Sequence, residues 1–335
     1  MRFDLTDEQR GIRDAARALC TRAYDQSALR ARMRGGDEGV RLWRELARNG
    51  WAGIAVSAEH HGQGLGMVEL ALVCDELGMV LAPATFVATA AAAIAVERGG
   101  TATQQARWLP GFASGDAPAA LATVQADGGA LALDADGAAA LLLIGGTRVS
   151  LAPADAYTLE DLDGVDVTRR LTRPSRIAAL EELKEPAAVM DRIEVCLSAE
   201  LVGVAQRALD IAVHHARTRE QFGRPIGAYQ AVSHRAADML IAVESARSAV
   251  LSAAWTADNS ADDLPFAASV AKSSAAAAAW ECASGALQIH GGIGFTWEHE
   301  CHLLLRRAAA TSRLLHGADW HLERAASLRG LAPAV

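Results

Sequence analysis

The sequence has few aromatic residues, few cysteines and no charged block of one sign, and each shortage excludes a class of protein. Cysteine occurs five times in 335 residues, at Cys20, Cys74, Cys196, Cys282 and Cys301, with no CxxC pair. An odd count without paired spacing argues against a disulfide framework and favours a reducing compartment. The N-terminal sequence MRFDLTDEQR is charged from its start and has no apolar run, which argues against a signal peptide. We therefore expect a cytoplasmic protein.

Long apolar runs and basic clusters are also missing. The most apolar stretch, residues 88–96, is mostly alanine and is shorter than the roughly 20 residues that span a bilayer, so we expect no membrane insertion. The formal net charge is -8, which excludes a nucleic-acid partner on electrostatic grounds. Hydrophobic residues, mainly alanine, leucine and valine, make up 51% of the chain. This composition predicts a large core and favours helices over sheets.

Composition divides the chain into three expected domains. Residues 1–112 read as helical, because Thr6 begins a capping signal of the S/T-x-x-E/Q type and the apolar residues after it recur at helical spacing. Further helices are expected over 40–49 and 67–80, with Pro83 and Pro110 at exits. Residues 113–182 alternate short apolar runs with glycine and aspartate turns, which is typical of a small β domain.

The third part, residues 183–335, returns to helical patterning. A long amphipathic helix starts at Pro186 and is interrupted at residues 223–227. More helices are expected over residues 229–258, 265–290 and 300–316, with a last one starting near Asp319. Short connections between long helices predict an antiparallel bundle. The expected fold class is therefore mostly α with a small β domain.

Two segments of this third part carry candidate chemistry. Residues 216–227, ARTREQFGRPIG, place three arginines and Phe222 in a turn between two helices. Guanidinium groups pair with phosphates, and an aromatic ring offers a stacking face. Residues 288–295, QIHGGIGF, place a glycine pair at a helix end, where bare backbone can approach a phosphate. Taken singly, the first segment also fits a solvated loop and the second a glycine C-cap.

Taken together, the two segments resemble the C-terminal domain of the acyl-CoA dehydrogenases. They match that family's R-x-x-F-G-[RK]-x-[IL]-x-x-x-Q and Q-[IV]-x-G-G-x-G-[FY] patterns in order and in separation. Residues 62–78 resemble its N-terminal helical domain, and residues 109–115 resemble the start of its middle β domain. The resemblance covers nearly the whole chain and implies the family fold, with a reduced β domain here and a C-terminal four-helix bundle.

The resemblance also implies a cofactor and a reaction. FAD is held across a dimer interface in this family, and the contacts to the neighbouring subunit's cofactor fall on Arg219, Phe222, Gln230, Gln288, Gly291 and Gly292. A carboxylate removes the α-proton of an acyl-CoA thioester, and the flavin accepts a hydride from the β-carbon. Electrons then pass to an electron-transfer flavoprotein.

Two departures from the family pattern narrow the resemblance. The family's Tyr-Glu-Gly-Thr segment, which carries the base, corresponds to residues 314–320, LLHGADW, without a glutamate. The Thr-Glu-Pro…Gly-Ser-Asp stretch beside the flavin ring is replaced by residues 120–127, ALATVQAD. Both departures resemble the short subunit of bacterial heterotetrameric acyl-CoA dehydrogenases, including steroid side-chain degraders, which shares one flavin site with a full-length partner. A homo-oligomer remains the alternative assembly.

Candidates for a base lie on the helix that starts at Pro186. Glu200 shares the apolar stripe of that helix, so its carboxylate is expected to be desolvated, which raises the pKa and suits a general base. Glu194 is the second candidate, because the helix-borne base of some family members aligns near it. The alternative for Glu200 is a buried salt bridge, for example to Arg207.

Residues 298–302, EHECH, concentrate side chains that can bind metals. Their spacing matches no known metal site and also fits a polar helix start, so no metal is expected. Three functions stay open: an FAD-dependent acyl-CoA dehydrogenase subunit, a non-catalytic partner that completes another subunit's flavin site, and an acyl-CoA oxidase-like flavoenzyme.

Overall fold

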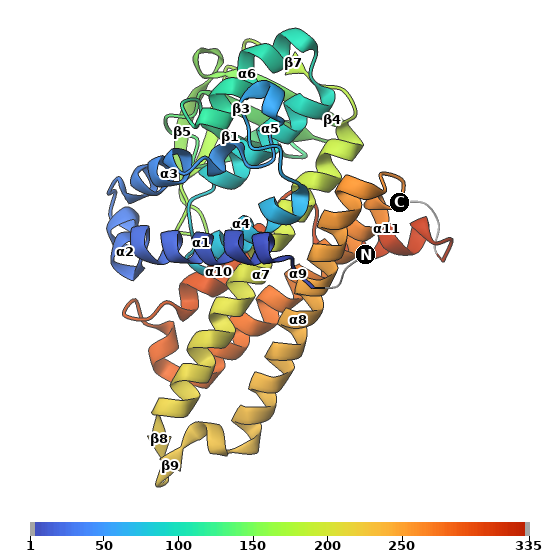
Figure 1. Cartoon of the computed structure of the whole chain (residues 1–335). Helices are drawn as coiled ribbons and strands as arrows, with labels where there is room; N and C mark the ends of the chain where they lie inside the picture. The colour runs from blue at the N-terminus through green and yellow to red at the C-terminus, as the bar shows by residue number, and fades with distance from the viewer. Residues whose placement is uncertain (1–3, 332–335) are drawn as a thin grey trace.

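The computed structural model describes residues 4–331 of the chain. The first three residues, which entered the argument against a signal peptide, and the outer ends of the first and third expected domains lie outside this range. Helices occupy both ends of the chain and a sheet lies between them in sequence (Figure 1). The expected fold class, mostly α with a small β domain, is confirmed.

Six helices precede the sheet: α1 (Asp7–Ala23), α2 (Gln26–Met33), α3 (Glu38–Arg48), α4 (Met67–Met79), α5 (Thr85–Gly99) and α6 (Ala102–Ser114). Thr6 caps α1 through a full capping box with Gln9, as the sequence predicted. The exit predicted at Pro110 is wrong, because Pro110 lies inside α6. The proline removes one N–H donor, but Phe112 and Ala113 after it are buried, and the helix continues until Gly115, which takes a φ of 81°.

The sheet has seven strands: β1 (Ala119–Val124), β2 (Ala130–Leu133), β3 (Ala140–Gly145), β4 (Arg148–Pro153), β5 (Thr158–Leu162), β6 (Leu171–Ser175) and β7 (Glu181–Glu182). Their order is β5-β6-β2-β1-β3-β4-β7, and only the β1–β3 pair is parallel. Alternate residues of β1 and β3 enter two separate apolar clusters, and one of these is continuous with the helical core. The central strands are therefore buried on both faces, and α5 packs on β1.

The C-terminal part is a bundle around α7 (Pro186–Thr218), with α8 (Gln230–Asn259), α9 (Leu264–His290), α10 (Cys301–Thr311) and α11 (Ala318–Leu328). α7 packs against α4, α8, α9 and α10. Helices α7, α8 and α9 begin and end within a few residues of their predicted bounds. The helix expected over 300–316 is shorter, because residues after Thr311 leave it to bring two carbonyl groups onto Lys272.

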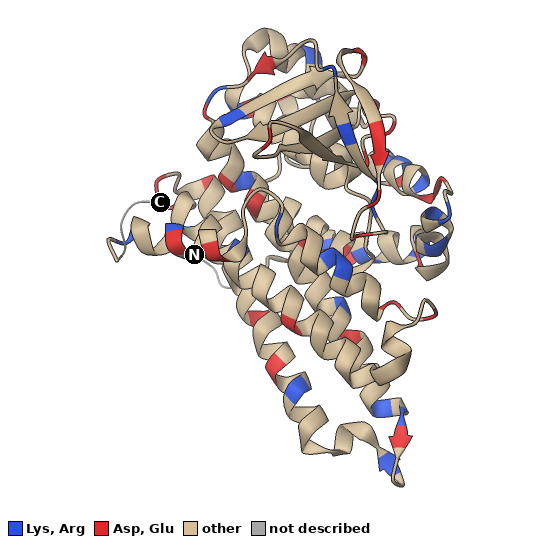
Figure 2. Ribbon diagram, turned by 180° about the vertical axis from the view of Figure 1, so that it is seen from behind, with Lys and Arg blue, Asp and Glu red and all other residues tan. Residues whose placement is uncertain are grey.

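A short hairpin, β8 (Glu220–Gln221) and β9 (Arg224–Pro225), joins α7 to α8 at the tip of the bundle, far from the sheet (Figure 1). Charges of both signs are spread over the chain, and long stretches of the bundle helices carry neither (Figure 2). Between residues 4 and 331, no helix is both long enough and apolar enough to cross a membrane.

Helices α4 and α7 touch backbone to backbone at two glycines. A Cβ built on Gly203 would lie 1.9 Å from Asp75 O, and one built on Gly78 would lie 2.1 Å from Glu200 O. Each glycine thus permits an approach that no larger residue tolerates. This crossing fixes the N-terminal helices on the bundle.

The crossing yields a matched pair of substitutions. Gly203→Ala is expected to lower the free energy of unfolding by at least about 1–3 kcal/mol, because the methyl group has to displace the α4 backbone. Gly11→Ala, in α1 with nothing within 4 Å of its built Cβ, should instead raise it by about 0.5–1 kcal/mol. Urea unfolding followed by circular dichroism measures both, and equal effects of the two changes would refute the close crossing.

Candidate functional site

The hairpin at the bundle tip presents the first group of predicted cofactor contacts. Arg219, Phe222 and Gln230 are all exposed, and the Phe222 side chain is 93% accessible. No described carboxylate forms an ion pair with Arg219. Phe222 and Gly223 both take positive φ, which forms the tight turn that projects the ring. The tip thus carries the exposed ring of Phe222 and, three residues before it in sequence, the Arg219 guanidinium without an ion-pair partner among the described residues.

The turn after α9 presents the second group. Gln288 and Gly292 are exposed, and Gly291 takes a φ of 63° that ends the helix. A Cβ built on Gly291 or Gly292 would meet nothing within 4 Å, so this backbone is open to the outside of the chain. The two groups lie at the same end of the bundle, since the ring of His290 stacks on that of His215 in α7 at 4.2 Å.

These donors suit a dinucleotide. One guanidinium and bare backbone amides match a diphosphate, two side-chain amides match ring or hydroxyl edges, and an exposed phenyl ring matches a base. All six predicted residues stand open rather than lining a closed cavity of this chain.

Glu200 is buried in α7, as its place on the apolar stripe predicted, and only 1% of it is accessible. Its Oε1 accepts from Arg169 Nη2 at 2.6 Å and from Arg307 Nη1 at 2.9 Å. The suggested partner Arg207 is wrong, because Arg207 pairs with Glu300 instead. Two guanidinium groups therefore hold this carboxylate.

Arg307 is the centre of this network and has no accessible surface. Besides Glu200 it bonds Asp166 Oδ2 at 2.6 Å, and it donates to the carbonyl groups of Leu81 and Ala82. Burial alone lowers the pKa of Arg307, but the charges of Asp166 and Glu200 outweigh burial and raise it. The guanidinium stays charged and ties α10 to α7, to the β5–β6 connection and to the turn after α4.

Glu194, also in α7, is buried, and only 2% of its surface is accessible. Lys272 Nζ donates to its Oε2 at 2.6 Å, and His321 Nε2 lies 3.2 Å from its Oε1. Burial alone would raise the pKa of Glu194, but the Lys272 charge and the hydrogen bonds from His316 and His321 hold it well below its usual range. Glu194 is therefore a carboxylate at any physiological pH, with a weak affinity for a proton.

Lys272, from α9, also holds residues 314–320, the segment that corresponds to the family's base-carrying stretch. Its Nζ donates to Leu314 O at 2.8 Å and to His316 O at 3.4 Å. The acid of that segment, Asp319, is exposed in the first turn of α11. Buried carboxylates in this region are thus neutralised by cations of the same chain.

Sequence reasoning missed Arg169, Lys272 and Arg307. A signal existed for Lys272, since it is one of two lysines in the chain and stands alone in an alanine-rich apolar helix. A cation at such a position is costly to bury unless an acid meets it. Arg169 and Arg307 gave no comparable signal, because both lie in ordinary polar sequence.

Removing the Lys272 charge should destabilise the fold. Lys272→Met leaves the buried Glu194 carboxylate without its cation, and an uncompensated buried charge costs about 3–5 kcal/mol. The second lysine, Lys184, is exposed, so Lys184→Met is a matched control with little expected effect. Urea unfolding measures both, and Lys272→Met combined with Glu194→Gln should recover most of the loss. A single-variant loss as small as that of the control would contradict the ion pair.

The stability of the chain should also depend on pH through Glu194 and Asp166. Burial raises the pKa of Asp166, but the charges of Arg307 and Arg169 lower it by more than burial raises it. In the folded chain, the pKa values of Asp166 and Glu194 therefore both lie below their ordinary values. Carboxylates of this kind contribute stability above their unfolded pKa, near 4, which is lost as pH falls below about 5. Thermal unfolding between pH 7 and 3 should show this loss, with a shallower slope in Glu194→Gln. Equal slopes would contradict the assignment.

Comparison with known proteins identifies the family. The acyl-CoA dehydrogenase N-terminal domain model matches residues 6–116, and the C-terminal domain model matches residues 188–319. The acyl-CoA dehydrogenase IpdE2 of Mycobacterium tuberculosis is 32% identical over 317 residues, with 92% of this chain and 93% of IpdE2 covered. FadE34 of the same organism is 34% identical over 97% of this chain, which spans 48% of FadE34.

Solved structures agree with this result. A variant of the Tcur3481-Tcur3483 steroid ACAD superposes with a TM-score of 0.82 at 28% identity, over 97% of this chain and 98% of that one. Butyryl-CoA dehydrogenase from Megasphaera elsdenii shares the fold with a TM-score of 0.83 at 21% identity, over 98% and 99% of the two chains. The resemblance inferred from the two glycine-containing segments is confirmed, and the chain belongs to the acyl-CoA dehydrogenase family.

Proposed function

We propose that this chain is the reduced subunit of a heteromeric, FAD-dependent acyl-CoA dehydrogenase. It contributes cofactor contacts to a flavin site whose ring-binding part and base belong to a full-length partner subunit. One observation carries this proposal: the buried acids on α7 are neutralised by cations of the same chain, whereas the six predicted cofactor contacts stand open at the bundle tip.

The contacts at the tip have distinct roles in this proposal. The Arg219 guanidinium pairs with the diphosphate, and the backbone N–H groups of Gly291 and Gly292 approach it closely. The Phe222 ring stacks on the adenine, and the amides of Gln230 and Gln288 bond its polar edges. When bound, FAD supplies the acceptor for the hydride that leaves the β-carbon of the acyl-CoA.

Glu200 and Glu194 take structural roles in this proposal rather than that of a base. A base has to accept the α-proton, so it needs a proton affinity near working pH and access to the substrate. The Glu194 pKa is held below its usual range, and Glu200 Oε1 faces two guanidinium groups. The proton therefore goes to a carboxylate of the partner.

The substrate and the assembly follow from the relatives as proposals. The 28% identical protein is a steroid ACAD whose name, Tcur3481-Tcur3483, joins two designations. This favours a steroid-derived acyl-CoA and a heterotetramer for the present chain, with an electron-transfer flavoprotein as electron acceptor. Within this subunit we propose three domains, residues 1–112, 113–182 and 183–335.

The visible absorption spectrum of the chain tests the proposal. Purified alone, the chain should carry far less than one FAD, because its contacts bind only one side of the cofactor. Coexpressed with a full-length acyl-CoA dehydrogenase subunit, the pair should show a flavin spectrum with about one FAD per two chains. One FAD per chain in the isolated protein would overturn the half-site assignment and indicate a homo-oligomer.

Variants of the coexpressed pair sharpen this test. Arg219→Ala should lower the flavin content, whereas Arg148→Ala, at the exposed start of β4, should not. Glu200→Gln in the same pair should keep turnover per bound flavin if it folds, and Glu194→Gln serves as the second variant. Loss of turnover at full flavin content in both would return the base to this chain.

A further inference from the structure

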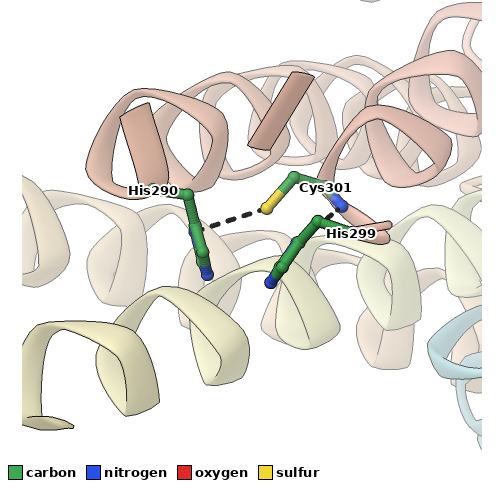
Figure 3. A group of neighbouring side chains, drawn as sticks. All are labelled: His290, His299 and Cys301. Carbon is green, nitrogen blue, oxygen red and sulfur yellow. Dashed lines mark hydrogen bonds between the residues drawn. The ribbon is translucent and has the colours of Figure 1, made fainter. Parts of the chain in front are cut away.

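Three side chains without a role in the proposed function converge where α9 ends and α10 begins. His290 is the last residue of α9, His299 lies in the connection and Cys301 is the first residue of α10. One nitrogen or sulfur atom from each lies within 4.8 Å of the others. Figure 3 shows the two imidazole rings side by side with the Cys301 sulfur between them.

The hydrogen bonds of the cluster leave His290 Nε2 and the Cys301 sulfur available, whereas His299 Nδ1 accepts the backbone N–H of Cys301 at 3.2 Å. His290 Nδ1 donates to Ala286 O at 2.8 Å, which places its ring proton on Nδ1 and leaves Nε2 unprotonated. A backbone carbonyl holding the far nitrogen in this way is the usual support of a metal-binding histidine. The Cys301 sulfur lies 3.3 Å from His290 Nδ1, and the His299 ring centroid lies 4.2 Å from that of His290.

Glu300 lies between His299 and Cys301 in sequence but is not one of the clustered ligands. The adjacent carboxylate of Glu300 is already held by Arg207 and Gln26.

A second group of possible ligands in the described part of the chain already has a cation beside it. Glu194, His316 and His321 also lie within 4.8 Å of one another. However, Lys272 Nζ stands 2.6 Å from the Glu194 carboxylate and already supplies the positive charge. In the His290 group, no lysine or arginine among the described residues forms an ion pair or a hydrogen bond with the three side chains.

We propose that His290, His299 and Cys301 form a binding site for a soft divalent cation of the Zn²⁺ type. Two imidazole nitrogens and one thiolate are ligands that zinc prefers. The fourth position is open to water. Binding forms two metal–nitrogen bonds and one metal–sulfur bond and releases the Cys301 thiol proton to solvent. His299 binds through Nδ1, which gives up its hydrogen bond from Cys301 N, and keeps its ring proton on Nε2.

The bound ion would join the end of α9 to the start of α10. The Gly291–Gly292 turn begins next to His290, so the metal would fix the turn's position on the bundle. This inference does not depend on the proposed function, because it rests on the ligands alone.

Zinc binding by the full chain tests the site. The protein is treated with a chelator, dialysed, reloaded with Zn²⁺ and desalted, and its metal content is measured by mass spectrometry. We expect about one zinc per chain, with affinity measured by competition against a chromophoric chelator. Cys301→Ser and His299→Gln should each weaken binding by at least about tenfold, as loss of a ligand or its support does. Cys282→Ser, which removes another buried thiol from α9, is the matched control and should bind as the unchanged chain does.

A second readout covers variants that fold poorly. Zn²⁺ should raise the melting temperature of the unchanged chain and of Cys282→Ser, but not that of Cys301→Ser or His299→Gln, with helical content checked by circular dichroism. Co²⁺ in place of Zn²⁺ should give a thiolate charge-transfer band that disappears in Cys301→Ser. No zinc retained by the unchanged chain, or zinc affinities of both ligand variants equal to that of the unchanged chain, would overturn the proposal.

Discussion

A fully buried guanidinium, that of Arg307, is the contact on which the arrangement of the chain depends. It comes from α10 and reaches Asp166 in the sheet connection, Glu200 in α7 and the backbone after α4. Leu81, whose carbonyl it holds, takes a φ of 55°, a conformation unusual for a leucine. A buried charge persists only when its partners are fixed, so the ion network couples segments from all three parts of the chain.

The buried acids of α7 are paired with cations of the same chain. Lys272 and Arg307 bring positive charge to the acids of α7 from the α9 and α10 side. The helices therefore remain packed without a ligand in this region. The polar groups at the tip of the bundle need no partner inside the chain, because they are exposed. The acids on α7 are thus paired inside the chain, whereas the polar side chains of the hairpin are exposed.

The sequence predicted the parts of this structure that depend on local rules. Thr6 with Gln9 marked the start of α1, and the apolar stripes marked α7, α8 and α9, because capping and helical spacing involve neighbours in sequence. Burial of Glu200 followed from its place on the stripe. The identity of its partners did not, because Arg307 lies 107 residues further along the chain. The predicted helix end at Pro110 was wrong, because burial of Phe112 and Ala113 after it stabilises the helix by more than the lost hydrogen bond costs. The cofactor segments were found through a family pattern, whereas their exposure needed coordinates.

Helix α7 runs without a break from beside the sheet to the hairpin, and this gives the chain a mechanical property. Its 33 residues form a rod about 50 Å long at 1.5 Å per residue. The rod is clamped near its middle by Gly203 against α4 and by the guanidinium groups on Glu200, and its last turn leads into the exposed hairpin. From Gly203 to Thr218 the helix covers about 22 Å, so a rotation of about 5° at the clamp would swing the tip by about 2 Å, which is more than a hydrogen bond tolerates. A small change in how α4 packs on α7 is therefore converted into a larger displacement of the hairpin.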